Sequence, residues 1–180
     1  MCITLIQRRR SVRKFADRPV EKKILDRIIE AALRSPSSRS VRPWEFVVVT
    51  DRDMLDNLSR AKHHGAGFLR SAAAGFVVLA DPEQCDVWIE DAAIASIIIQ
   101  LAAESLGLGA CWIQIRNRMH GDAVTAGEYI ADLLNIPPHL QVESIIAFGY
   151  PAEEKEPHDT QTLRYDKVHH NRYGSDYHGV

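Results

Sequence analysis

Apolar residues recur along the chain with two different periods, and each period predicts a different kind of element. Residues 20–33 place isoleucine, leucine and alanine on one stripe after Pro19, which indicates an amphipathic helix. Residues 45–50 and 75–80 are short apolar runs of the kind that forms buried strands. The full pattern predicts helices at residues 20–33, 52–61, 87–106 and 122–134, and strands at residues 45–50, 75–80, 110–115 and 142–150.

One predicted helix differs from the others because residues 87–106 are apolar on nearly every side. Such a helix must be covered all round, either by its own core or by a second subunit. In a chain of this size, a homodimer that packs through this helix is one of these two solutions. After Pro151 the composition becomes polar, which indicates an irregular extension. We expect one domain over residues 1–180, with a core at about residues 7–151 and an extension at 152–180.

Composition and charge narrow the classes of protein. Apolar residues make up 46% and charged residues 26%, and the formal net charge is -2, so any anion site must come from local clustering. The three cysteines never show CxxC spacing, which argues against a disulfide framework or a thiolate zinc site. The N-terminus reverses the order of a signal peptide, and the longest apolar run is interrupted by polar residues. These features favour a cytoplasmic protein without a membrane span.

The stretch "QRRRSVRKF" is the first candidate for chemistry, with Arg9, Arg10, Ser11 and Arg13 close together before the first predicted helix. Guanidinium groups bind phosphate through forked, charge-assisted hydrogen bonds, and a serine hydroxyl adds a short donor. The cluster could hold one phosphate group, and a solvated basic face explains it equally well. Nucleic-acid binding is a weaker interpretation, because there is no second basic patch and no flanking stacking aromatic.

The stretch "SPSSRSVRPWEF", residues 35–46, is the second candidate. Its serines offer hydroxyls, its prolines restrict the backbone, and Arg39 and Arg42 bring positive charge. A polar helix-to-strand connection without a ligand accounts for most of these residues, and taken alone it is the better interpretation.

The stretch "GLGACWIQIRNR", residues 107–118, is the third candidate. Its two glycines allow a close backbone approach, and a strand end presents amides. Trp112, Arg116 and Arg118 are equally compatible with core or surface roles. The histidines show no zinc spacing, and G-x-S-x-G, P-loop and G-x-G-x-x-G motifs are missing, so no metal site is expected and hydrolases and Rossmann dehydrogenases lose support.

Four stretches in this order resemble the nitroreductase family of flavin mononucleotide (FMN) oxidoreductases. They are "RRSVRKF", "SPSSRSVRPWEFVVV", "EDAAIASIIIQLAAESLGLGACWI" and "AFGYPAEEK", and "YDKVHHNRYG" also looks like the tails of short members. The resemblance covers about Arg9 to Lys155. It implies an α+β sandwich with a central, mostly antiparallel sheet covered by helices, a domain-swapped-like homodimer, and FMN at each subunit interface.

The resemblance also implies roles for individual residues. Arg9, Arg10 and Ser11 match the phosphate and ribityl contacts, and Arg13 matches the basic residue near the flavin pyrimidine ring. Further matches line the ring or complete the phosphate site. They are Pro36, Ser37, Ser38, Ser40 and Arg42 from the loop, Trp112, Ile113 and Gln114 from the strand, and Gly149, Lys155 and Arg164 toward the end of the chain.

Two positions depart from the family pattern, since many relatives carry asparagine and glutamine where this chain has Ser40 and Arg42. If Arg42 faces the ring, its charge would favour the anionic reduced flavin. The expected activity is transfer of reducing equivalents from NADH or NADPH, through bound FMN, to a small-molecule acceptor such as a nitroaromatic or quinone in ping-pong fashion. No catalytic acid–base pair is then required. Dehalogenation, flavin breakdown and flavin binding without turnover are the alternatives.

Overall fold

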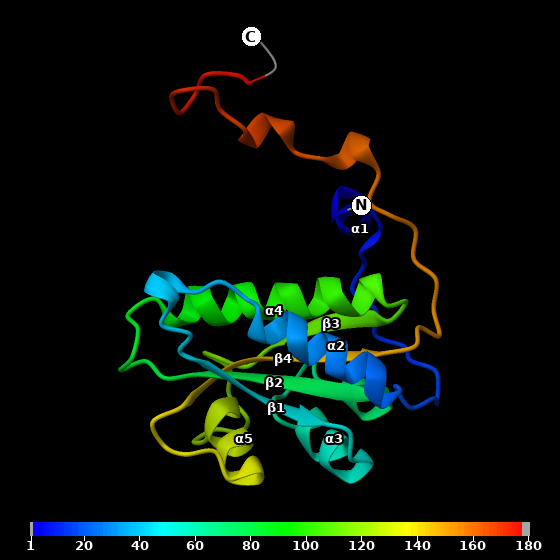
Figure 1. Ribbon diagram of the computed structural model, residues 1–180, viewed down its shortest axis with the longest axis vertical. Helices are drawn as coiled ribbons and strands as arrows, with labels where there is room; N and C mark the ends of the chain where they lie inside the picture. Colours follow the sequence, from blue (N-terminus) through cyan, green and yellow to red (C-terminus); the bar gives the residue numbers. More distant parts are fainter. Residues whose placement is uncertain (1, 178–180) are drawn as a thin grey trace.

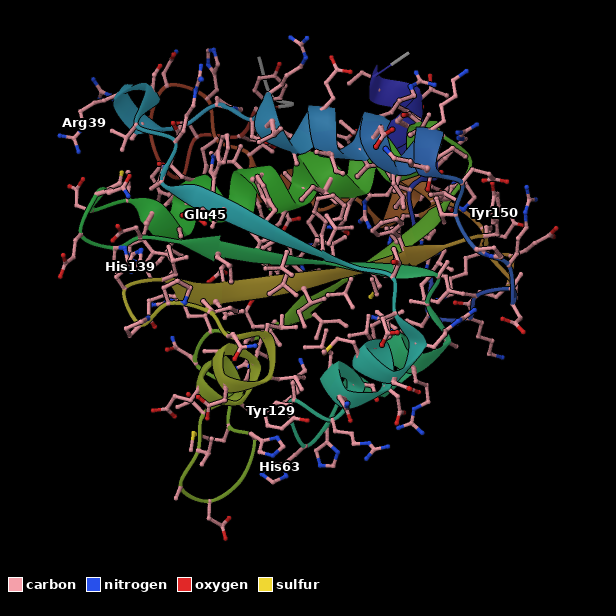
Figure 2. All side chains as sticks on the ribbon, turned by 60° about the horizontal axis from the view of Figure 1, so that its bottom comes forward. Arg39, Glu45, His63, Tyr129, His139 and Tyr150 are labelled. Carbon is pink, nitrogen blue, oxygen red and sulfur yellow. The ribbon has the colours of Figure 1, made fainter. Side chains whose placement is uncertain are left out.

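The computed structural model describes residues 2–177, and its centre is a four-stranded sheet. The strands are β1 (Trp44–Val49), β2 (Ala74–Ala80), β3 (Gly109–Gln114) and β4 (Gln141–Gly149), in the order β1-β2-β4-β3. Every neighbouring pair is antiparallel, as the resemblance implies. Glu45 near the start of β1 and Tyr150 after β4 mark opposite ends of the sheet (Figure 2). The strand order makes β1 and β3 the two edge strands.

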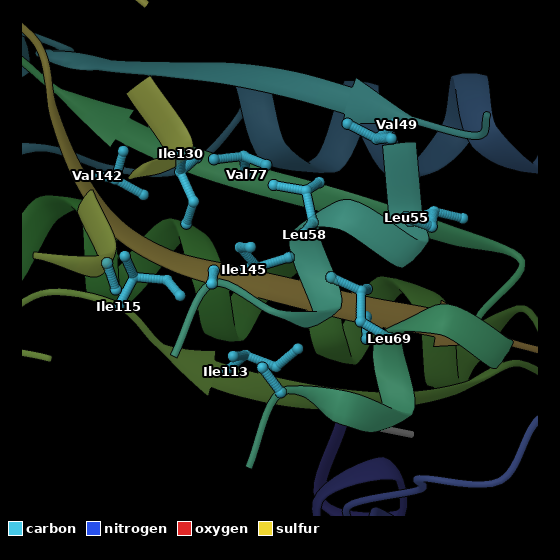
Figure 3. Packing of buried hydrophobic residues seen from close by; sticks show 14 of the residues in the cluster. Val49, Leu55, Leu58, Leu69, Val77, Ile113, Ile115, Ile130, Val142 and Ile145 are labelled. Carbon is cyan, nitrogen blue, oxygen red and sulfur yellow. The ribbon is translucent and has the colours of Figure 1, made fainter. Parts of the chain in front are cut away.

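Helices cover both faces of this sheet (Figure 1). On one face lie α2 (Lys22–Leu33) and α4 (Trp88–Ser105), and on the other lie α3 (Arg52–Ser59) and α5 (Ala126–Leu134). Side chains of a strand alternate between the faces, so neighbours such as Phe76 and Val77 belong to different apolar clusters. Figure 3 shows the cluster under α3 and α5, where Val77, Ile113 and Ile145 meet. Coverage of both faces explains why β2 is buried throughout.

The structure confirms the predicted helices and strands, with different ends for several of them. Asp51 caps α3, as predicted, by accepting a hydrogen bond of 2.8 Å from the backbone N–H of Met54. The prediction was wrong for the start of α5, which begins at Ala126 and not at residue 122. The reason is a capping box, in which Thr125 and Glu128 satisfy each other's backbone N–H.

Two segments stand apart from the sheet and its helices. Helix α1 (Cys2–Arg8), which the hydrophobic pattern did not predict, contacts α4 through the ion pair of Arg8 with Glu104 at 3.8 Å. Residues 151–177 contain only short 3-10 helices, η3 (Thr160–Thr162) and η4 (Tyr165–Lys167). Helix α1 and the part of the extension that holds η3 and η4 project beyond the α4 layer (Figure 1). Among the described residues, no helix combines the length and apolar character that crossing a membrane requires.

Candidate functional site

The open edge of β3 is the centre of the candidate site. The N-terminal segment meets the start of this edge, where Ser11 bridges Ala110 and the N–H of Val12 donates to the carbonyl of Ala110 at 3.0 Å. Since the carbonyl of Ala110 points away from β4, the amides of Trp112 and Gln114 must point the same way. Within the described residues, no hydrogen bond is found for these two N–H groups. The edge therefore presents free backbone donors beyond Ser11.

Gly109 brings the N-terminal segment close to this edge. A Cβ at this position would lie 2.7 Å from the Cβ of Val12, well inside ordinary carbon contact. Any larger residue would push the segment of Arg9, Arg10 and Ser11 away from the strand. The glycine that the sequence marked as permissive is thus required by packing.

Basic side chains gather where the N-terminal segment meets the residues after β4. Lys155 Nζ donates to the carbonyl of Ser11 at 2.7 Å and pairs with Glu153 at 3.1 Å. The guanidinium of Arg10 donates to the carbonyl of Glu156. A pocket of about 190 Å³ opens here, lined in part by Arg10, Gly109 and Lys155. The fold therefore brings Arg10 and Ser11, two of the three predicted contacts from the N-terminus, together with Lys155 from the extension.

The electrostatics of Cys111 and Glu153 show how dense this charge is. Burial raises the pKa of the Cys111 thiol, and the charges of Arg13, Lys155 and Arg9 oppose that rise. The pKa of Glu153 is lowered, chiefly because its carboxylate accepts the backbone N–H of Arg13 at 2.7 Å. Within the described residues, no ion pair is found for the side chains of Arg9, Arg10 or Arg13. These cations are available to an anion.

Lys62, which the sequence analysis did not select, belongs to the same region. Burial lowers its pKa, repulsion from Arg118 lowers it further, and only Cys111 opposes the shift. Further along the chain, the ring centroid of Phe68 lies 5.8 Å from the guanidinium carbon of Arg13. A single lysine beside two histidines carries no pattern in the sequence, so only the fold could reveal this position.

The loop at residues 35–43 is strained. Arg39, Ser40 and Arg42 all have positive φ, at 52°, 56° and 56°. Left-handed backbone at residues other than glycine costs about 1–3 kcal/mol each and is often found at functional sites. Ser37 Oγ holds the conformation by accepting the N–H of Arg42 at 2.8 Å, and buried Asp91 holds it by accepting the N–H of Ser38 at 2.9 Å. This loop is more than a flexible polar connection.

One chain holds the loop and the basic cluster apart. Ser38 is bound to Asp91 in the first turn of α4, whereas Arg8 pairs with Glu104 in its last turn. The helix has 18 residues, which corresponds to a length of about 27 Å. The loop also leads into β1, which is the edge opposite β3. Figure 2 shows the same separation, with Arg39 and Tyr150 at opposite ends of the molecule.

The other predicted site residues have different surroundings. Ile113 is buried in the core, and Pro36 is exposed at the start of the loop. Gly149 packs against Ala73 and Phe15, and a Cβ there would lie 3.0 Å from the backbone N of Ala73. Close packing thus gives Gly149 a structural role. Arg164 lies in the extension and pairs with Asp166 at 2.6 Å.

Polar residues surround the far end of β3. Gln114 accepts a hydrogen bond from Trp112 Nε1 at 3.0 Å and donates one to the carbonyl of Arg116 at 3.1 Å. Glu143 lies nearby and is only 4% exposed, and among the described residues one of its carboxyl oxygens has no hydrogen-bond partner. Burial raises the pKa of Glu143, and Gln114 and Arg116 partly offset that rise. These bonds fix the side chain of Gln114 beside the free edge.

The site can therefore bind an elongated anion at one end and a hydrogen-bonding group along the strand. Free N–H groups on β3 suit a planar heterocycle, and the cations at Gly109 suit its phosphate. Among the described residues, no group of histidine, cysteine, aspartate and glutamate side chains could hold a metal ion.

Comparisons with known proteins match this chain to one family and its fold. The model of the family described as "Nitroreductase family" matches residues 6–67 and 60–150. A solved structure of an FMN-dependent nitroreductase from Clostridium difficile has a TM-score of 0.93 and 49% identity, over 95% of this chain and 99% of that one. An Archaeoglobus fulgidus protein, whose name proposes an NADH dehydrogenase or NAD(P)H nitroreductase, is 33% identical over 96% of this chain and 98% of its own length. A Thermus thermophilus NADH dehydrogenase is 28% identical over 86% of this chain and 88% of its own length.

Proposed function

This chain belongs to the nitroreductase family, and from that membership we propose that it is an FMN-dependent oxidoreductase that takes reducing equivalents from NADH or NADPH. The observation that carries the proposal is the open edge of β3. The cations gather at the start of this strand, and the unpaired amides of Trp112 and Gln114 lie further along it. Nitroaromatics and quinones are the proposed acceptors.

The cation cluster fits the phosphate of FMN. Arg9, Arg10 and Lys155 would bind its oxygens, and the hydroxyl of Ser11 would add a donor. Glu153 does not oppose this role, because its carboxylate is already engaged by Lys155 and by the N–H of Arg13. Gly109 keeps the whole segment within reach of β3.

The strand fits the ring of FMN. The N–H groups of Trp112 and Gln114 would donate to its polar edge, and Arg13 would place a positive charge beside its pyrimidine end. When bound, FMN would accept reducing equivalents from NAD(P)H and then pass them to the second substrate. The residues of the chain bind, orient and shield, so no catalytic acid–base pair is needed.

We propose that the complete site needs two copies of the chain. The strained loop lies at the β1 edge and beside the first turn of α4, away from the β3 edge of its own chain. In a dimer it would cover the β3 edge of the second copy with Pro36, Ser37, Ser38, Ser40 and Arg42. Helix α4 supports this arrangement, because it exposes two apolar side chains: Ile94 and Ile97 are each 39% exposed. The projecting α1 adds Ile3 and Ile6, at 66% and 53% exposure. Such apolar surface is typical of subunit contacts.

The dimer has a direct test. Ile97→Glu places a charge on the exposed face of α4, where burial against a second copy would be costly. Sedimentation equilibrium should show a dimer for the wild type and a monomer for the variant. The variant should also lose affinity for FMN. Equal masses for the two proteins would contradict the arrangement.

The phosphate site has its own test, in which Lys155→Met removes the ammonium that bonds the carbonyl of Ser11. Loss of a charge-assisted hydrogen bond of about 1.5–3 kcal/mol should raise the dissociation constant of FMN about ten- to a hundredfold. Fluorescence titration of apoprotein with FMN measures this change. Lys23→Met is the matched control, since Lys23 is exposed on α2 and does not line the proposed pocket. Equal loss in both variants would contradict the assignment.

Kinetics separate this activity from its alternatives. Ping-pong transfer predicts parallel double-reciprocal lines when NADH and a quinone are varied. A flavin-binding protein without turnover would keep FMN oxidised in the presence of NAD(P)H. An enzyme of flavin breakdown would instead consume FMN under oxygen, and a dehalogenase would release halide from a halogenated substrate.

A further inference from the structure

A second pocket lies beyond the end of β3, where the strand leads into α5. Its volume is about 220 Å³, and Trp88, Arg116, Asn117, Arg118 and Thr125 contribute to its lining. The lining of the pocket begins at Ile115, directly after Gln114, so the pocket lies at the end of the strand to which the proposed function assigns the flavin ring. It lies at the opposite end of β3 from the proposed phosphate site.

The turn at this pocket is rigidly held. Asn117 has a positive φ of 58°, the N–H of Arg118 donates to the carbonyl of Ile115 at 3.0 Å, and the carbonyl of Arg118 accepts the N–H of Ala126 at 2.8 Å. Arg116 is tethered as well, because its N–H donates to the carbonyl of Glu143 at 3.0 Å. Its guanidinium carbon lies 5.8 Å from the ring centroid of Trp88. The two arginines are thus presented from a fixed backbone.

The positive charge at this pocket is balanced in part by the buried Glu143, whose pKa burial raises and the charge of Arg116 lowers. Neither Arg116 nor Arg118 forms an ion pair within the described residues, and the guanidinium of Arg118 donates only to the carbonyl of Asn117, at 3.0 Å. Repulsion by Arg118 is among the causes that lower the pKa of Lys62. The nearest acid of α5, Glu128, is engaged in the capping box with Thr125. A bound anion would relieve this repulsion.

We propose that Arg118, with Arg116 and Trp88, binds the anionic group of a substrate whose reactive part lies at the β3 edge. The inference rests on the proposed function, because it places this group beyond the flavin ring. Trp88 offers an aromatic surface and the arginines bind carboxylate or phosphate oxygens, so an acidic aromatic acceptor suits the pocket. A phosphate of the nicotinamide donor has the same chemistry, and the experiment distinguishes the two sources.

The experiment compares an anionic substrate with a neutral substrate of similar size. FMN-loaded protein reduces 4-nitrobenzoate or neutral 4-nitrobenzyl alcohol, with NADH or NADPH as the donor. In Arg118→Gln, the kcat/KM ratio of the acid to the alcohol should fall about tenfold, and Arg118→Lys should retain part of it. Arg27→Gln, an equal change of charge on exposed α2, should leave the ratio as in the wild type. Isothermal titration with 4-nitrobenzoate should show the same loss in affinity without turnover.

Each outcome has one meaning. A loss confined to the acid assigns the pocket to the acceptor, and a loss confined to NADPH assigns it to the phosphate of the donor; both support an anion subsite. The subsite is overturned if Arg118→Gln changes neither the ratio of the acid to the alcohol nor the ratio of NADPH to NADH, or if it lowers kcat/KM equally for both acceptors and both donors. Reduction of the neutral alcohol by wild-type protein tests the proposed function alone, so a failure of the subsite is distinguishable from a failure of that function.

Discussion

Gly109→Ala is the sharpest perturbation of the proposed cofactor site, because it changes one methyl group at the closest backbone approach in that region. The new Cβ would lie 2.7 Å from the Cβ and one Cγ of Val12, whereas carbon atoms at optimal separation are about 3.5–4.0 Å apart. Val12 and its neighbours would have to move by about 1 Å. That movement stretches the hydrogen bond from Val12 to Ala110 and shifts the basic cluster away from β3.

The magnitude follows from the cost of overpacking, which is about 1–3 kcal/mol for an extra group in a packed site. The apoprotein can relax by releasing the N-terminal segment, whereas FMN binding needs the segment in place. A penalty of about 2 kcal/mol therefore corresponds to an FMN dissociation constant about thirtyfold higher. Fluorescence titration of apoprotein with FMN gives this constant.

Gly67→Ala is the matched control, since nothing lies within 4 Å of a Cβ at that position. A second variant, Gly109→Ala with Val12→Gly, removes the colliding Cβ and should recover part of the affinity. The reasoning is refuted if Gly109→Ala binds FMN as tightly as the wild type while circular dichroism shows an unchanged fold.

Three further predictions concern a carboxylate near Tyr150, the cap of α5 and the strained loop. Glu21 accepts hydrogen bonds from Tyr150 and Arg18, which lower its pKa from 4.5 to about 2, so its contribution to stability is present above pH 4.5 and is lost as the pH falls through about 2. Chemical unfolding should show wild type and Glu21→Gln diverging at pH 6 and converging near pH 2; an equal gap at both pH values would contradict this. Thr125→Ala removes the cap of α5 and should cost about 1 kcal/mol in a urea titration, and no cost would count against the capping box. Arg42→Ala should lower the two-electron potential of bound FMN by about 30 mV if the loop covers the ring, and an unchanged potential would sink that placement.

The sequence predicted the elements well because their signals are local. The stripe of α2 and the apolar run of β2 need only neighbours in the chain, and the Asp51 cap needs only three residues. The prediction of where α5 starts was wrong for an equally local reason. Asp122 and Thr125 are both good caps, and only Thr125 has a glutamate three residues later.

The site was less predictable because it depends on long-range pairing. Nothing in the composition of β3 shows that it is an edge strand, so the family resemblance suggested amides at Trp112 to Gln114 and the fold alone shows why they are unpaired. Turn chemistry anticipated the loop and not its left-handed residues. Gly149 was expected at the phosphate site, and its packing on Ala73 supplies a sufficient structural reason for the glycine.

The most direct measurement is the visible spectrum of the purified protein, loaded with FMN, before and after anaerobic addition of NADH or NADPH. The account predicts flavin absorption bands that co-elute with the protein, bleach on addition of the donor, and return when a quinone is added. Protein that fails to retain FMN when supplied with it, or whose bound FMN stays oxidised with both donors, would contradict the account.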